Sequence, residues 1–395
     1  MNAVIFGGGK IARGFIAHLL YRSGYHITIV ELNEALVRSL NQNGRYYVNV
    51  MGNQDACQWV TNYECISLKD TEAIARALEK ADIVFTSVGG KNLDSLAHTI
   101  AEAYVLAASR LGDRKFTIIT CENWKNPAKQ LRESLCAELD GTKWREFFEQ
   151  NVGVSEAVIM RSGVEATEEI RRIDENAVSV TSFWELPVDR TRMAGELPEF
   201  EGVVYQDDFD SFLQRKLYTF NTTNATIAYL GQLRGIGLLA DAANDPEILK
   251  IVHQVHDEIN PAIAREMGGT LEEQCRFAEK ALRKYQDISV TDFTERHARD
   301  PLRKLGPSDR IVGTLRLVEK HGLPIRGLAT TLAAALYYPV PDDQDSSAVR
   351  LKEMREEAGI TRVLEDICGI GSEEPLAQAV WQQIEFLKEK GWIDG

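Results

Sequence analysis

The first half of the chain alternates short apolar runs with segments of helical periodicity. Runs that are rich in β-branched residues, and that end at polar residues or glycine, are typical of buried strands at 3–7, 26–31, 82–89 and 116–123. Between them, apolar residues recur at helical spacing in 10–24 and 70–81. Strands that alternate with helices predict βαβ units, and therefore a parallel sheet with helices on both faces.

Beyond residue 195 the pattern becomes almost entirely helical. One more strand pattern at 177–190 is followed by a turn-rich, acidic segment at 195–210. Helical segments then occupy 208–231, 234–243, 246–266, 271–284, 310–320, 326–337, 346–357, 361–369 and 373–390. Since 395 residues exceed what one hydrophobic core usually serves, we predict two domains, 1–195 and 196–395.

A glycine-rich turn, VIFGGGKIARGF, joins the first strand pattern to the first helical pattern. In its GxGxxA pattern Gly7 permits a tight turn, Gly9 lets a pyrophosphate approach the backbone, and Ala12 lets helix and sheet pack closely. Glu31 ends the second strand pattern, where an acid bonds the adenosine ribose and repels a 2′-phosphate. Gly89, in a later turn, is placed either to pass under the cofactor or to serve as a plain connection.

These features predict an α/β fold with an N-terminal doubly wound sheet of Rossmann type, followed by a mostly α-helical C-terminal domain. NAD is the predicted cofactor, in preference to NADP. The alternative is a glycine turn that binds no dinucleotide.

Composition excludes several other classes of partner and site. The formal net charge of −14 lacks the basic surface that nucleic acid requires. No apolar run approaches about 18 residues, and the sequence opens without a basic leader, so we expect a cytoplasmic protein with no membrane partner. Six cysteines lack CxxC or metal-site spacing, which predicts reduced thiols, and seven histidines form no convincing zinc set. No metal is expected.

One lysine of the second half stands in an unusual row of amides and hydroxyls, RKLYTFNTTNATIAYLG. Amides within a helix lose some propensity, so this row predicts a solvated working face rather than a core stripe. A metal-free alcohol dehydrogenase needs a base for the hydroxyl proton and donors for the developing alkoxide. Lys216 can be that base if burial or nearby positive charge lowers its pKa, and Asn221 and Asn123 can be the donors. The alternative is a surface lysine.

A basic, proline-broken segment lies at 295–310. Its basic residues are Arg296, Arg299, Arg303, Lys304 and Arg310. They predict either a clamp for an anionic or polyhydroxy substrate or a solvated loop in which neighbouring acids pair with them.

The whole chain resembles the polyol-specific long-chain dehydrogenases. The likeness is carried by AVIFGGGKIARGFIAHLL, CENW, RKLYTFNTTNATIAYLG and DPLRKLGPSDR. It implies a metal-independent, NAD-dependent oxidoreductase that interconverts a polyol or sugar-derived alcohol and its ketose. By this resemblance Lys216 is the catalytic base, and Asn123 and Asn221 are the amides that stabilise the alkoxide.

The resemblance also implies a set of substrate-binding residues, in which this sequence departs from the family at two positions. Arg296 and Lys304 match substrate contacts, and Asn224 and Arg161 stand at substrate positions whose surroundings have changed. The family carries histidine where Asn224 stands, and aspartate where Met160 precedes Arg161. Both departures predict an altered substrate.

Three functional alternatives remain open at this stage. A phosphorylated polyol and a free hexuronate are both anions that suit Arg296 and Lys304, so a hexuronate reductase of the fructuronate or tagaturonate type is the second enzyme. A non-catalytic NAD-binding protein is the third. We expect a small-molecule polyol, sugar phosphate or sugar acid as partner, and a monomer or dimer.

Overall fold

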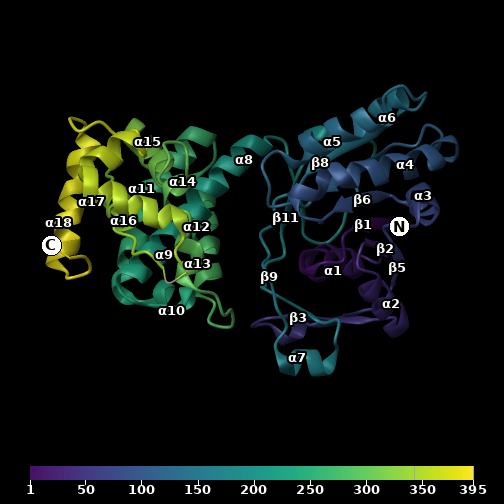
Figure 1. Cartoon of the computed structure of the whole chain (residues 1–395), viewed down its shortest axis with the longest axis horizontal. Coiled ribbons are helices and arrows are strands. Elements are labelled where there is room, and N and C mark those ends of the chain that lie inside the picture. The colour runs from purple at the N-terminus through teal and green to yellow at the C-terminus, as the bar shows by residue number, and fades with distance from the viewer. Residues whose placement is uncertain (342, 395) are drawn as a thin grey trace. The chain divides into compact units, whose positions relative to one another are not determined.

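The computed structural model describes residues 1–341 and 343–394, and it divides the chain into two units, Met1–Phe209 and Asp210–Gly395 (Figure 1). The observed division lies beyond the predicted boundary at 195. β12 (Val203–Gln206) pairs in parallel with β11 (Leu186–Asp189) in the first unit. The acidic segment therefore contains a strand of the first unit and is not a linker.

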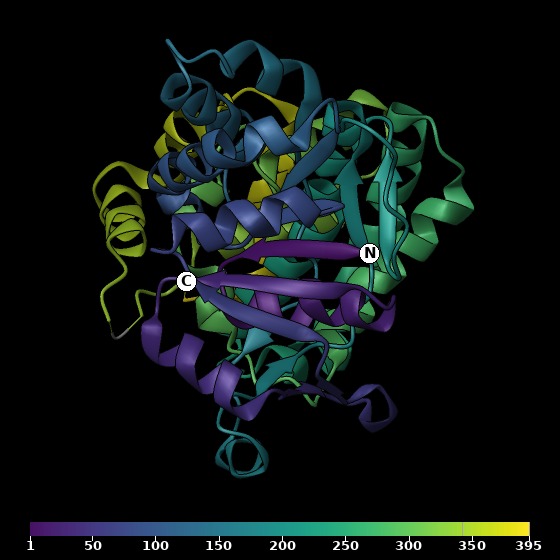
Figure 2. The same ribbon diagram turned by 90° about the vertical axis from the view of Figure 1, so that its right-hand side faces the viewer.

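Among the described residues, the first unit is built on a six-stranded sheet in the order β5-β2-β1-β6-β7-β8, with every pair parallel. Its strands are β1 (Asn2–Phe6), β2 (His26–Glu31), β5 (Tyr63–Ser67), β6 (Ile83–Thr86), β7 (Phe116–Thr120) and β8 (Val152–Glu156). In Figure 2, β1 and β2, coloured purple, run side by side. This order is that of the Rossmann fold, in which ligands bind at the carboxyl ends where the winding reverses, here between β1 and β6.

Helices cover both faces of this sheet, as the doubly wound prediction requires. They are α1 (Ala17–Arg22), preceded by a π-helical turn at Ala12–Ile16, α2 (Glu34–Asn43), α3 (Thr71–Lys80), α4 (Leu93–Leu111), α5 (Pro127–Glu138) and α6 (Arg145–Asn151). A further helix, α7 (Glu168–Ile173), buries none of its residues. Because side chains alternate along a strand, Val4 and Phe6 enter the core with α3 and α4, whereas Ala3 and Ile5 enter the core with α1. The fold class is confirmed.

A second, four-stranded sheet was not predicted. It has the order β4-β3-β10-β9, from β3 (Tyr46–Val50), β4 (Gln58–Val60), β9 (Gly163–Val164) and β10 (Val178–Val180). The single strand expected at 177–190 is therefore two strands, β10 and β11, in different sheets. The short β3, β4 and β9 escaped detection because runs of two to five residues carry little periodicity.

The second unit is helical, as predicted. Its helices are α8 (Phe209–Lys216), α9 (Thr222–Leu233), α10 (Leu239–Asn244), α11 (Pro246–Met267), α12 (Leu271–Gln286), α13 (Thr294–Ala298), α14 (Pro301–Lys304), α15 (Val312–Lys320), α16 (Arg326–Leu336), α17 (Ser346–Asp366) and α18 (Pro375–Glu389). A π-helical turn at Leu217–Asn221 joins α8 to α9. None of the helices in the described part of the chain has the length and apolar character needed to cross a bilayer.

The row of amides and hydroxyls, RKLYTFNTTNATIAYLG, lies mostly inside this unit and not on a solvated face. Thr222, Thr223 and Thr226 of α9 are buried. Their hydroxyls bond Thr314 at 3.0 Å, His256 at 2.8 Å and Thr331 at 2.9 Å. The interpretation of the whole row as a wet face is therefore wrong for the threonines, which satisfy buried polar groups between packed helices.

Candidate active site

The glycine turn of the first unit has the geometry of a dinucleotide cradle. Gly7 follows β1 with φ +101°, and a Cβ there would lie 2.3 Å from the carbonyl oxygen of Ser87, which follows β6. Gly9 is the opposite case, since no other heavy atom lies within 4 Å of its Cβ position. Ala12 is fully buried where the helix meets the sheet. The turn is thus closed toward the sheet and open at Gly9, where a pyrophosphate would fit.

Glu31 lies against this turn. Its carboxylate accepts hydrogen bonds from the backbone N–H groups of Gly8 at 2.5 Å and Asn33 at 2.7 Å. On the buried side, Arg13 donates from Nε to the Gly8 carbonyl at 2.7 Å and also bonds the Asn176 carbonyl. Burial lowers the pKa of Arg13. Sequence reasoning missed Arg13, which fixes the turn that Glu31 flanks.

A second carboxylate, Glu122, organises the turn around Gly89. It accepts hydrogen bonds from the backbone N–H groups of Val88 and Gly89, each at 2.9 Å, and from the Thr86 hydroxyl at 3.1 Å. Gly89 has φ +84°, and Glu122 is only 7% exposed. Glu122 was not predicted as a site residue, although its place immediately before Asn123, at the end of a strand pattern, was a signal.

Asn123 is exposed just beyond β7, at the carboxyl edge of the sheet. The next residue, Trp124, packs over Gly90, where a Cβ would lie 2.1 Å from the indole ring. Anchors on both sides, Glu122 and Trp124, therefore hold the backbone that presents the Asn123 amide.

In the second unit, a π-helical turn affects which way the amide of Asn221 faces. In a regular α-helix residues five apart lie about 140° round the axis, so Lys216 and Asn221 would diverge. A π-helical turn closes bonds between residues five apart, which brings such residues closer round the axis than in an α-helix. The turn spans Leu217–Asn221 and directly follows Lys216, so we expect Asn221 to face the side of Lys216 more nearly than a regular helix would allow. Asn224 follows three residues later, on the same side of α9.

Three lysines of this region have lowered pKa values. Burial, with the nearby charge of Arg310, lowers the pKa of Lys216 to about 8. Burial is the main cause, and the nearby charge of Lys216 the next, of a pKa of Lys284 on α12 that is lowered to about 8. Burial, with Arg310 and Arg303, lowers the pKa of Lys304 to about 7. Lys216 can therefore lose its proton near neutral pH, as a general base must. Sequence reasoning missed Lys284 and the effect of Arg310.

The short helices α13 and α14 bring the other predicted residues to α9. Asn224 Nδ2 lies 3.1 Å from Nδ1 of His297, whose Nε2 lies 2.7 Å from Oδ2 of Asp292. Arg296 donates from Nε to Asp292 at 2.7 Å. Lys304 donates from Nζ to the carbonyl oxygen of His297 at 2.6 Å. One connected network thus joins Asn224, Arg296 and Lys304.

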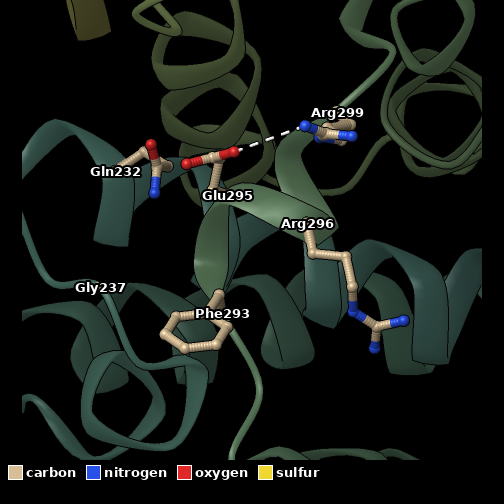
Figure 3. Close-up of a pocket in the computed structure, with 6 residues that line it drawn as sticks. All are labelled: Gln232, Gly237, Phe293, Glu295, Arg296 and Arg299. Atoms are coloured by element: carbon tan, nitrogen blue, oxygen red, sulfur yellow. Dashed lines mark ion pairs between the residues drawn. The ribbon is translucent and has the colours of Figure 1, made fainter. Parts of the chain in front are cut away.

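A pocket of about 340 Å³ opens beside Arg296. It is lined by Gln232, Gly237, Phe293, Glu295, Arg296 and Arg299 (Figure 3). Glu295 and Arg299 point toward each other and pair at 3.6 Å, whereas Arg296 points away from that pair. Arg303 pairs with Asp300 at 2.5 Å. Such pairing is what the solvated-loop alternative describes, and it holds for Arg299, for Arg303 and for Arg296, which pairs with Asp292 in the network around Asn224.

Comparison with known proteins identifies the family to which this geometry belongs. Residues 1–202 match the model of the mannitol dehydrogenase Rossmann domain, and residues 208–387 match the model of the mannitol dehydrogenase C-terminal domain. The chain belongs to the mannitol dehydrogenase family. The predicted resemblance is confirmed, and with it the enzyme class, an NAD-dependent dehydrogenase with a Rossmann-type domain.

Members of the mannitol dehydrogenase family match along nearly the full length. Mannitol-1-phosphate 5-dehydrogenase of Bacillus pumilus is 32% identical over 385 residues, 97% of this chain and 99% of the relative. That of Bacillus licheniformis is 34% identical over 383 residues, 96% and 98% of the two chains. Among solved structures, D-sorbitol dehydrogenase superposes with a TM-score of 0.80 at 16% identity, over 99% of this chain and 93% of the other. Pseudomonas fluorescens mannitol 2-dehydrogenase gives 0.65 at 17%, over 99% and 92%. These structures share the fold.

Arg161 differs from what the family resemblance implied. Its side chain is 1% exposed, and it donates to the carbonyls of Phe183 at 2.6 Å and Gly14 at 3.0 Å. Its guanidinium lies 4.1 Å from the centre of the Trp184 ring. These contacts give Arg161 a structural role in the first unit, and its predicted contact with a substrate stays a prediction. Met160, at 2% exposure, is buried as well.

Because Glu122 orders the turn around Gly89, we expect it to affect binding of the cofactor. We expect Glu122→Ala to raise the Kd for NADH about tenfold, because the N–H groups of Val88 and Gly89 lose the acceptor that orders their turn. Glu122→Gln keeps one acceptor oxygen and should raise the Kd only about threefold. Fluorescence titration of NADH measures both values, with the exposed Glu133→Gln as the control. An unchanged Kd for Glu122→Ala would contradict this role.

Proposed function

We propose that the chain is a metal-independent, NAD-dependent dehydrogenase that interconverts a polyol or sugar-derived alcohol, phosphorylated or acidic, and its ketose. The observation that supports this proposal is Lys216, the last residue of α8, whose pKa is lowered to about 8 and which directly precedes the π-helical turn that ends at Asn221. The open backbone at Gly9 and the carboxylate of Glu31 support NAD as the cofactor.

Three residues of this chain carry out separate parts of alcohol oxidation, namely removal of the proton and stabilisation of the alkoxide. Neutral Lys216 takes the proton of the substrate hydroxyl as its carbon is oxidised. NAD, when bound, supplies the hydride acceptor. Asn221 and Asn123 donate amide N–H groups to the developing alkoxide, and preorganised donors of this kind lower the barrier most where charge appears. In the reverse direction, the Lys216 ammonium returns the proton.

The network on α13 and α14 is placed to bind the end of the substrate that is farther from the reacting carbon. Arg296 pairs with Asp292, and buried Lys304, whose pKa is lowered to about 7, would gain a proton on meeting an anionic group. Cations so placed suit a phosphate or a carboxylate. The names of the Bacillus relatives support a phosphorylated polyol, whereas Asn224, which departs from the family pattern, supports a changed hydroxyl pattern.

A substrate panel tests this proposal. Purified protein is assayed by NADH absorbance with mannitol 1-phosphate, sorbitol 6-phosphate, the free polyols, fructose 6-phosphate, fructuronate and tagaturonate. We expect the highest kcat/KM with a phosphorylated polyol and its ketose. A hexuronate that surpasses every phosphate would establish the hexuronate reductase instead. NADH binding without turnover on any compound would favour the non-catalytic alternative.

A further inference from the structure

A histidine that no prediction assigned to the site, His297, lies at the centre of the network on α13. Its ring joins Asn224 at 3.1 Å to Asp292 at 2.7 Å, and its backbone carbonyl holds Lys304 at 2.6 Å. The side chains of His297 and Asp292 are 20% and 17% exposed, so their contact is shielded from most competing water. Two proposed substrate residues, Asn224 and Lys304, thus depend on His297 for their positions.

The two contacts of the ring fix its tautomer. Burial alone would raise the pKa of Asp292, but hydrogen bonds from His297 and Arg296 outweigh burial and lower that pKa, so this carboxylate is ionised and can only accept. The nearer group at Nε2 is this carboxylate, with Arg296 Nη2 at 3.2 Å, so the ring proton is on Nε2. Nδ1 is then an acceptor, and it takes a hydrogen bond from the Asn224 amide.

This arrangement determines what Asn224 offers to a ligand. Its Nδ2 is engaged by His297, so its Oδ1 is the atom presented to a substrate hydroxyl. Without the imidazole, the amide could turn over and present a donor in place of the acceptor. The imidazole that the family carries at position 224 is therefore present, but it is supplied from α13, 73 residues further along the chain.

We propose that His297 is a specificity-determining residue, which with Asp292 holds the Asn224 amide so that its carbonyl oxygen accepts a hydrogen bond from a substrate hydroxyl. This inference rests on the proposed function and deepens it. The compound selected is a polyol, or its ketose, with a hydroxyl donor next to the reacting carbon in the configuration that Oδ1 can reach. An epimer at the carbon that bears this hydroxyl cannot make the hydrogen bond to Oδ1, and is therefore a poorer substrate.

The test uses His297→Ala, His297→Gln and the exchange Asn224→His/His297→Asn. For the best substrate of the panel, we expect His297→Ala to raise KM about tenfold with kcat within about threefold, and to reduce the preference over the epimer by a similar factor. His297→Gln should recover part of the loss, because its amide can accept from Asn224 and donate to Asp292. The exchange, which restores an imidazole facing an amide, should return KM to within about threefold of the wild type.

A matched control is His321, which also bonds a carboxylate, Glu266, at 3.0 Å and is 19% exposed. His321→Ala should leave KM and epimer preference unchanged, and thermal unfolding and NADH binding confirm that each variant is folded. An unchanged KM and epimer preference in His297→Ala would overturn the proposal. So would an equal loss in all three His297 variants, which marks a purely structural role. If Lys216→Met retains turnover, the proposed function fails, whatever His297 does.

Discussion

Replacing Lys216 with methionine is expected to lower kcat for alcohol oxidation by about 10²–10⁴-fold, the range that general base catalysis supplies. Methionine keeps an unbranched side chain of similar length, so packing along α8 and the π-helical turn is largely preserved while the proton acceptor is lost. Steady-state kinetics with NAD and the best polyol measure the effect. Lys320→Met, which removes an exposed lysine paired with Glu266, is the control and should keep wild-type turnover. Turnover near wild type in Lys216→Met would remove this lysine from its role.

The pH dependence of the same reaction gives a second readout of Lys216. Its pKa is lowered to about 8, so the neutral base is the minor form below that pH and the major form above it. Oxidation should therefore accelerate as pH rises through about 8 and then level off, whereas reduction, which needs the ammonium form, should slow over the same range. Arg310→Gln removes one cause of the lowered pKa and should move both midpoints to higher pH. Unmoved midpoints would exclude Lys216 as the titrating group.

The sequence was sufficient where local chemistry alone decides the structure. Gly7 is fixed by a backbone conformation and a close approach that a side chain would forbid, and its pattern with Gly9 is visible in a few letters. The alternation of strands and helices likewise predicted the parallel sheet, because buried parallel strands need continuous apolar runs. Periodicity could not place the division between the units, since β12 is a short strand in an acidic segment.

The arrangement of the candidate site residues depends more on tertiary structure, which the spacing of residues in the sequence cannot reveal. A helix expected to run unbroken from 208 to 231 contains a π-helical turn, and that turn changes the direction in which Asn221 faces relative to Lys216. The burial of Arg161 was equally hidden from the sequence, since a motif position implied a substrate contact but did not show that tertiary packing encloses the side chain. His297 is joined to Asn224 across 73 residues, a pairing that no local pattern records.

The second large effect is expected at the two amides, Asn123 and Asn221, which belong to different units of the chain. Loss of one donor to a developing oxyanion costs about 10²–10³-fold in kcat, so Asn123→Ala and Asn221→Ala should each show a loss of that order. Neither amide belongs to the glycine turns, so the Kd for NADH should remain within about twofold in both variants. Asn244→Ala, which removes an amide bonded to the carbonyls of Ala240 and Gln286, is the control and should retain turnover.

The double variant Asn123→Ala/Asn221→Ala decides whether the two amides serve the same oxygen. Groups that act together on one transition state are strongly non-additive, so the combined loss should fall short of the product of the single losses by about tenfold or more. That shortfall is a coupling free energy of about 1.4 kcal/mol, well above the scatter of about 0.5 kcal/mol for independent sites. Losses that simply multiply would place the amides on different atoms of the substrate. A single variant with nearly full turnover would instead remove that amide from the reaction and leave the alkoxide to the remaining donor and the neighbouring cations.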